Sequence, residues 1–161
     1  RDITFLSKDG GYSSDGLLHF DMKNDLVIYH HFYTNHIYAL DTNLNLRYKA
    51  STIDTNKTFK TKGALCQSSY TLSSPPIAVN KTSCVDNGTL YINSMIVAEN
   101  ENPDALEKND VIDMYDLRTG NYQGSFYIPL IKNSKVKQLA IEDTLLLIRY
   151  TNNIVLYNLS K

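Results

Sequence analysis

A nine-residue pattern occurs twice in this chain and constrains its fold more than any other feature. Residues 33–41 read Y-T-N-H-I-Y-A-L-D and residues 150–158 read Y-T-N-N-I-V-L-Y-N, so both follow Y-T-N-x-I-x-x-x-D/N. A third copy of its second half, I-D-M-Y-D, lies at residues 112–116. Each copy is preceded by another apolar run, and each run follows a turn rich in Asp, Asn or Gly. Short strands joined by such turns predict an antiparallel all-β protein.

The spacing of these copies predicts the size of the repeating unit. The step from Asp116 to Asn158 is 42 residues, which is typical of a four-stranded blade of a β-propeller. The step from Asp41 to Asp116 is nearly twice as long, but no further pair of apolar runs lies inside it. We therefore interpret residues 55–76 and 98–109 as two insertions.

We predict a single partial β-propeller over residues 1–161, built from four-stranded antiparallel meanders. Residues 1–14 contain an outer strand of a neighbouring blade and a turn. The first blade spans 15–54, the second 77–131, and the third, 135–161, lacks its fourth strand. Strands of the second blade are expected at 77–85, 90–97, 111–116 and 122–128. A single helical turn is expected where Pro103 and Asp104 follow Asn102.

The blade endings carry a family resemblance. They read I-Y-A-L-D-T-N-L at 37–44, I-D-M-Y-D-L-R-T-G at 112–120 and I-V-L-Y-N-L at 154–159. These endings resemble those of the six-bladed, TolB-like propellers of secreted and surface-associated bacterial proteins. The resemblance covers about residues 15 to 161 and implies an extracytoplasmic location, in the periplasm or at the cell surface. Closed propellers have about four to eight blades and this chain supplies about three. We therefore expect that the chain is part of a longer propeller, or that a partner chain completes the ring.

The composition argues against two classes of partner. A formal net charge of −1 creates no long-range field that would attract nucleic acid or an anionic membrane. No apolar run approaches the roughly 20 residues of a membrane helix. We expect no nucleic-acid partner, no membrane span and no cofactor. Cys66 and Cys84 lack the C-x-x-C spacing of common zinc and redox sites, so they either form a disulfide or remain two buried thiols.

Three of the four histidines lie within residues 30–36, where a metal site is the first hypothesis to consider. The equivalent C-terminal hairpin, L-L-L-I-R-Y-T-N-N-I-V-L-Y, contains no histidine, so the hairpin geometry does not require imidazole. A two-residue turn at Thr34-Asn35 would place Tyr33 opposite His36, and His31 would reach His36 only diagonally. We interpret these histidines as hairpin residues and predict no metal site.

Both insertions are expected on one face of the molecule, together with the Thr34-Asn35 tip. In an up-and-down blade the turn between strands two and three lies at the same end as the connection to the next blade. Loops on a rigid scaffold often bind partners. The candidate binding residues are Tyr33, His36, Lys60, Lys62, Tyr70, Glu99, Glu101 and Asp104. The lysines and aromatic residues suit an anionic or sugar ligand, whereas the acids suit a cation.

The sequence contains no G-x-S-x-G elbow, no Gly-rich phosphate loop and no H-E-x-x-H motif. Our hypothesis is a non-enzymatic propeller module that binds a protein or carbohydrate partner at the face carrying the inserts. The alternative is a hydrolase or lyase with an active site in the central channel, completed by blades outside this chain.

Overall fold

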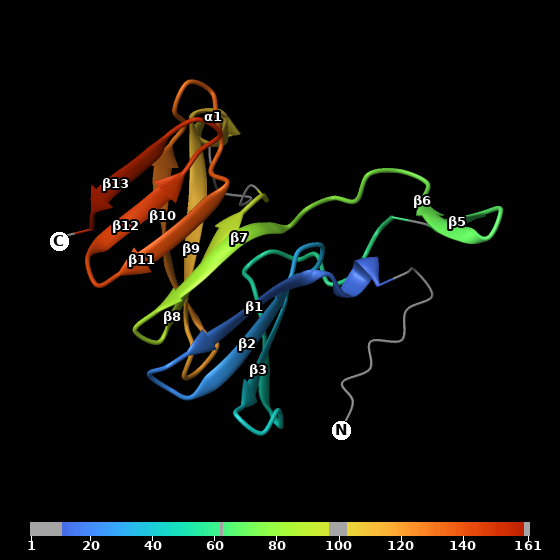
Figure 1. Ribbon diagram of the computed structural model, residues 1–161, viewed down its shortest axis with the longest axis horizontal. Coiled ribbons are helices and arrows are strands. Elements are labelled where there is room, and N and C mark those ends of the chain that lie inside the picture. The colour runs from blue at the N-terminus through green and yellow to red at the C-terminus, as the bar shows by residue number, and fades with distance from the viewer. Residues whose placement is uncertain (1–10, 62, 97–102, 160–161) are drawn as a thin grey trace.

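The computed structural model describes residues 11–61, 63–96 and 103–159, which form an all-β fold (Figure 1). Sheet 1 contains β1 (Gly16–Asp21), β2 (Leu26–His31), β3 (His36–Asp41) and β4 (Leu46–Ser51). Sheet 2 contains β7 (Asn80–Asp86), β8 (Thr89–Ser94), β9 (Asn109–Asp116) and β10 (Tyr122–Pro129). Sheet 3 contains β11 (Gln138–Glu142), β12 (Leu145–Arg149) and β13 (Ile154–Asn158). The other elements are η1 (Tyr12–Ser14), β5 (Gly63–Cys66), β6 (Ser69–Leu72) and α1 (Pro103–Lys108).

The predicted antiparallel meanders are confirmed. Sheets 1 and 2 each pair four strands in sequence order, and every ladder is antiparallel. β9 and β10 match the strands predicted at 111–116 and 122–128 to within two residues at each end. β7 begins at Asn80, later than predicted, after an irregular segment that contains two prolines without a backbone N–H. The first insertion contains a short hairpin, β5–β6, which the sequence pattern did not predict.

Local side-chain chemistry explains why the repeat ends on Asp. Asp41 Oδ1 accepts hydrogen bonds from the backbone N–H groups of Asn43 and Asn45, both at 2.9 Å. In the equivalent turn of sheet 2, Asp116 Oδ1 accepts the N–H of Arg118 at 2.7 Å. A carboxylate at this position satisfies donors that a tight turn leaves without a strand partner. The repeated Asp therefore stabilises the turn between the third and fourth strands.

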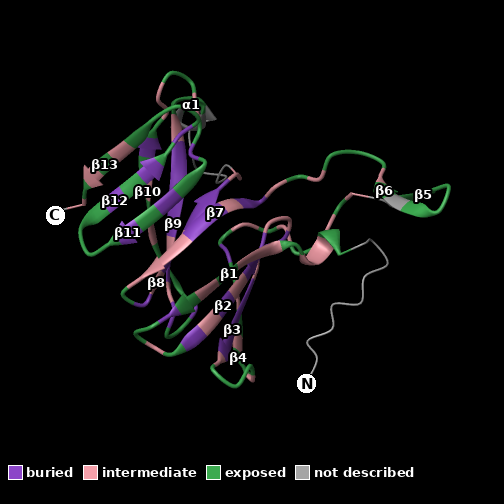
Figure 2. Cartoon of the chain, viewed as in Figure 1, coloured by how far each residue is buried: buried purple, intermediate pink, exposed green. Residues whose placement is uncertain are grey.

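Two apolar clusters hold the three sheets together (Figure 2). Between sheets 1 and 2 the buried residues include Ile28, Ile37, Leu90, Ile92 and Tyr115. Between sheets 2 and 3 they include Ile112, Ile128, Leu139, Ile141, Leu146, Ile148 and Tyr150. Sheet 2 is thus covered on both faces, and β7 lies beside β1 and beside β11. The first strands of the three sheets are neighbours, so the sheets form a blade-like arc; the described residues form no closed ring.

Among the residues that the structure describes, no helix combines the length and apolar character required to cross a bilayer.

Candidate functional site

Each sheet has two ends with different connections. At one end lie short turns at residues 22–25, 42–45, 87–88, 117–121 and 143–144, and we call this end the turn face. At the other end lie 32–35, 52–61, 73–79, α1, 130–137 and 150–153, and we call it the loop face. Asn80, Ser94 and Val111 are matched across β7, β8 and β9 at this second end. Both insertions therefore leave the sheets at the loop face.

The hairpin that carries the histidines differs from the predicted geometry. β2 and β3 are joined by four residues, 32–35, instead of a two-residue turn. The pairing of His30 with Ile37 places His31 directly beside His36, and their ring centroids are 5.7 Å apart. The predicted diagonal approach was wrong, although the two rings do share one face of the sheet. Burial and the neighbouring His36 lower the pKa of His31 to about 4, so this ring is neutral at pH 7.

Distant segments fix the 32–35 loop. The side chain of Asn80, on β7, donates hydrogen bonds to the backbone carbonyls of His31 at 2.9 Å and Thr34 at 3.3 Å. On the other side the backbone N–H of Asn35 donates to the carbonyl of Asn56, and its side chain donates to the carbonyl of Asp54. These bonds hold a longer loop than the local sequence suggested. They also make it a rigid part of the loop face.

The structure brings only some of the predicted binding residues together. Tyr33 packs against Phe59, with ring centroids 5.6 Å apart, and the ammonium of Lys60 donates to Asn56 Oδ1 at 2.8 Å. These residues form an aromatic and basic group where the first insertion begins. His36 lies on the face of sheet 1 that points away from sheet 2, where it contacts the buried side chains of His31 and Tyr38.

The remaining candidates lie elsewhere or outside the described residues. Asp104 is exposed on α1, and the backbone of Tyr70 belongs to β6, on the hairpin that projects away from the sheets (Figure 1). Lys62, Glu99 and Glu101 lie outside the described residues. The described part of the chain contains no group of three or more His, Cys, Asp or Glu residues arranged to hold a metal ion.

A polar cluster that the sequence did not reveal joins sheets 1 and 2. Ser83 Oγ on β7 lies 2.6 Å from Nε2 of His19 on β1 and 2.6 Å from Nε2 of His30 on β2. The two imidazole rings are nearly parallel, with centroids 6.1 Å apart. A hydroxyl can donate to one neutral imidazole while it accepts from the other, so both contacts are satisfied. No local motif could have signalled this cluster, because Ser83 is more than fifty residues away from both histidines.

The surroundings of the cluster favour a packing role over catalysis. Burial, with a smaller effect of His19, lowers the pKa of His30 to about 3. An efficient general base needs a pKa near the working pH, so His30 is a weak base for activating Ser83. Ser83 is also buried in the contact between the sheets. The cluster therefore supplies hydrogen bonds where inner strands of two sheets meet.

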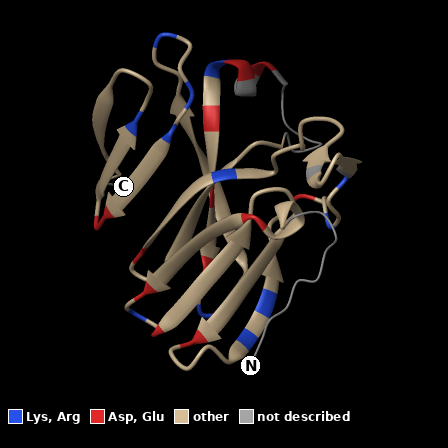
Figure 3. Cartoon of the chain, turned by 45° about the vertical axis from the view of Figure 1, so that its right-hand side comes forward, with Lys and Arg blue, Asp and Glu red and all other residues tan. Residues whose placement is uncertain are grey.

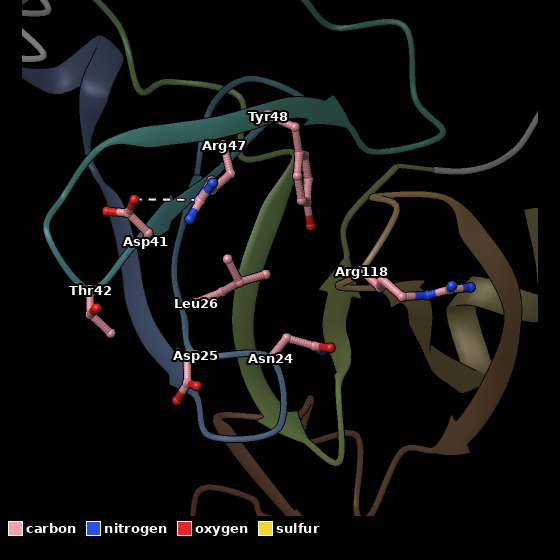
Figure 4. Close-up of a pocket in the computed structure, with 8 residues that line it drawn as sticks. All are labelled: Asn24, Asp25, Leu26, Asp41, Thr42, Arg47, Tyr48 and Arg118. Atoms are coloured by element: carbon pink, nitrogen blue, oxygen red, sulfur yellow. Dashed lines mark ion pairs between the residues drawn. The ribbon is translucent and has the colours of Figure 1, made fainter.

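A pocket of about 460 Å³ opens at the turn face, between sheets 1 and 2 (Figure 4). It is lined by Asn24, Asp25, Leu26, Asp41, Thr42, Arg47, Tyr48 and Arg118. Arg47 pairs with Asp41 at 3.4 Å, and the Arg118 side chain points away from this ion pair. Acidic residues lie at many strand ends of this face (Figure 3), where Asp41 and Asp116 accept hydrogen bonds from backbone N–H groups of their turns. Within the lining, Asp41 thus stabilises its own turn and neutralises Arg47.

Both cysteines are free thiols in the structure, so the disulfide that the sequence allowed is not formed. Cys66 is exposed on β5, away from the three sheets, so the alternative of two buried thiols was wrong for this residue. Cys84 lies on β7 and packs against the cluster between sheets 2 and 3. Burial raises the pKa of the Cys84 thiol to about 12, which keeps it protonated and unreactive.

Comparisons with known proteins assign no family to this chain: no protein-family model matches it, and neither does a curated protein.

Proposed function

We propose that this chain is a non-enzymatic propeller module that binds a protein partner at its loop face, with the β5–β6 hairpin as the principal contact. The supporting observation is that this hairpin stands apart from the three sheets (Figure 1). β5 pairs only with β6 among the described strands, and the described side chains of residues 64–69 are exposed. Leu65 is 78% exposed. An isolated two-stranded hairpin is at best marginally stable in water.

A protein partner suits this hairpin better than a carbohydrate does. Each of its two strands has one edge not paired within the described residues, and such edges offer backbone N–H and C=O groups to an added strand. An exposed leucine adds apolar surface that a polypeptide can bury. At the base of the hairpin, Lys57 and Lys60 are exposed beside the Tyr33–Phe59 pair. This group favours a partner with acidic residues next to the strand that it contributes.

The loop face also provides a rigid base for such an interaction. Hydrogen bonds from Asn80 and to Asn56 fix the 32–35 loop on both sides. A pre-ordered base reduces the conformational entropy lost on binding. In this proposal the β5–β6 hairpin contacts the partner, and the loop face holds the base of the hairpin in place.

Site-specific photo-crosslinking in the source cells tests this proposal. A photoreactive amino acid at Leu65 should crosslink a protein partner, whereas the same amino acid at Leu44, an exposed leucine of the turn face, should not. The crosslinked partner is then purified and its binding measured by calorimetry. Replacing residues 64–71 by a Gly-Ser linker should weaken binding by at least about tenfold, and Leu44→Ser should leave it unchanged. Equal binding by the hairpin variant would refute the role of the hairpin.

Hydrolysis is the competing hypothesis, and the Ser83 cluster is the feature that a test must address. Ester, lactone and glycan panels should show no turnover with this protein. Turnover that is lost in a Ser83→Ala variant, while partner binding persists, would replace the binding proposal by an enzymatic one.

A further inference from the structure

The packing of one sheet on the next follows the same rule twice within this chain. We call the face that each sheet turns toward the following sheet its trailing face, and the opposite face its leading face. The trailing face of sheet 1, with Ile28 and Ile37, packs on the leading face of sheet 2, with Leu90 and Ile92. The trailing face of sheet 2, with Ile112, packs on the leading face of sheet 3. Two faces have no sheet over them in the described structure: the trailing face of sheet 3 and the leading face of sheet 1.

The third strands of the repeat show directly what covering a trailing face does. Ile37, Ile112 and Ile154 each lie four residues before the end of β3, β9 and β13. The first two are 1% and 0% exposed, whereas Ile154 is 67% exposed. The same side chain at the same register position is therefore buried wherever a following sheet exists.

Three leucines share the trailing face of sheet 3 with Ile154, while Gln138, Glu142 and Arg149 are polar side chains on this face. Leu145, Leu147 and Leu156 all lie on this face, and all are exposed. Leu145 pairs with the last residue of its third strand, as Leu26 does in sheet 1, and Leu26 is buried. Four large aliphatic side chains on adjacent strands form a contiguous apolar surface of a kind that rarely remains in contact with water.

The leading face of sheet 1 is the matching half of this interface. Leu18 and Phe20, on β1, are 66% and 51% exposed. Their counterparts on β11, in the same positions before the end of the strand, are Leu139 and Ile141, which are both buried against sheet 2. The first strand of sheet 1 thus exposes side chains in the positions that sheet 3 uses to contact the sheet that precedes it, whereas Tyr38 and Leu40 on the same face are already buried.

We propose that two copies of this chain assemble head to tail, with the trailing face of sheet 3 in one copy on the leading face of sheet 1 in the other. Each end of the arc carries one half of an interface that the chain already forms internally, so a second copy satisfies both halves. Such an interface joins unlike surfaces, and it avoids open polymers only if it closes into a ring. Two arcs of three sheets give six, which lies within the range of about four to eight for closed propellers.

The oligomeric state of the purified chain tests this proposal. Sedimentation velocity and light scattering at about 50 µM should give twice the 18.3 kDa chain mass. Ile154→Glu and Leu18→Glu should each weaken association by roughly 10- to 100-fold, because each places a charge in the interface. Leu44→Glu, at an exposed leucine of the turn face, should leave the mass unchanged. Circular dichroism and urea midpoints measured at low concentration check that each variant folds.

Mixing the two interface variants distinguishes a head-to-tail contact from a symmetric one. A Leu18→Glu chain keeps an intact trailing face and an Ile154→Glu chain keeps an intact leading face, so the mixture should recover part of the dimer through one undamaged interface. A wild-type protein that stays monomeric at about 50 µM would overturn the proposal and indicate that other sheets cover these faces. A dimer that only one of the two variants disrupts, or that neither disrupts, would overturn it too.

Discussion

The burial of His30 should make the fold sensitive to acid. This side chain is fully buried, and its Nε2 atom lies 2.6 Å from Ser83 Oγ. Burial, followed by the neighbouring His19, lowers its pKa from 6.5 to about 3, while a hydrogen bond to the backbone of His31 acts weakly in the opposite direction. In the unfolded chain the ring regains its ordinary pKa. Between these two values the unfolded state binds the proton and the folded state does not.

The direction and size of the effect follow from linkage. Since the unfolded state binds more protons in this window, the free energy of unfolding rises with pH. The contribution of His30 is fully present above pH 6.5 and is lost as the pH falls toward 3. Each pKa unit corresponds to about 1.4 kcal/mol, so a change from neutral pH to pH 5 should remove about 2 kcal/mol of stability through this residue.

Urea unfolding of the wild type and a His30→Gln variant, at about pH 7.5 and about pH 5, measures this contribution. Glutamine retains a donor and an acceptor for Ser83 but does not titrate. The variant should be less stable than the wild type at the higher pH. On acidification, however, its free energy of unfolding should fall by about 2 kcal/mol less than that of the wild type. Both proteins contain the same carboxylates. Subtracting the loss of stability of the variant from that of the wild type therefore cancels the contribution of these carboxylates. Equal losses in the two proteins would refute the assignment of the effect to His30.

Two further predictions concern the packing of the sheets. Gly120 has a φ of 76°, and a Cβ atom there would lie 2.6 Å from the Cβ of Ala50. A Gly120→Ala variant should therefore lose about 1–3 kcal/mol of stability in urea unfolding. An unchanged urea midpoint would contradict this close approach. Cys66 should react with a thiol reagent at the rate of an exposed cysteine, whereas Cys84 should react roughly 100-fold more slowly until urea unfolds the chain. A Cys66→Ser variant isolates the second rate, and fast labelling of that variant under native conditions would show that Cys84 is not packed between sheets 2 and 3.

Some features of the candidate site were encoded locally and others were not. The alternation of residues along β2 and β3 places His31 and His36 on one face, and the sequence predicted this correctly. The predicted length of the loop between the two strands was wrong. The local pattern suggested two residues, but Asn80 from another sheet stabilises a loop of four. The contact of Ser83 with His19 and His30 depends on how two sheets meet, which no short stretch of sequence records.

The sequence by itself determined most strands of the three sheets, the short turns of the turn face and their repetition. These features depend on neighbouring residues, because side chains alternate along a strand and an Asp can cap a turn within a few positions. Only the tertiary structure decided what each face contacts. Ile37, Ile112 and Ile154 read alike in the chain, yet two are buried and one is exposed. Burial is set by the sheet that packs above a residue, and that sheet comes from a distant part of the chain or, as we propose for Ile154, from a second copy.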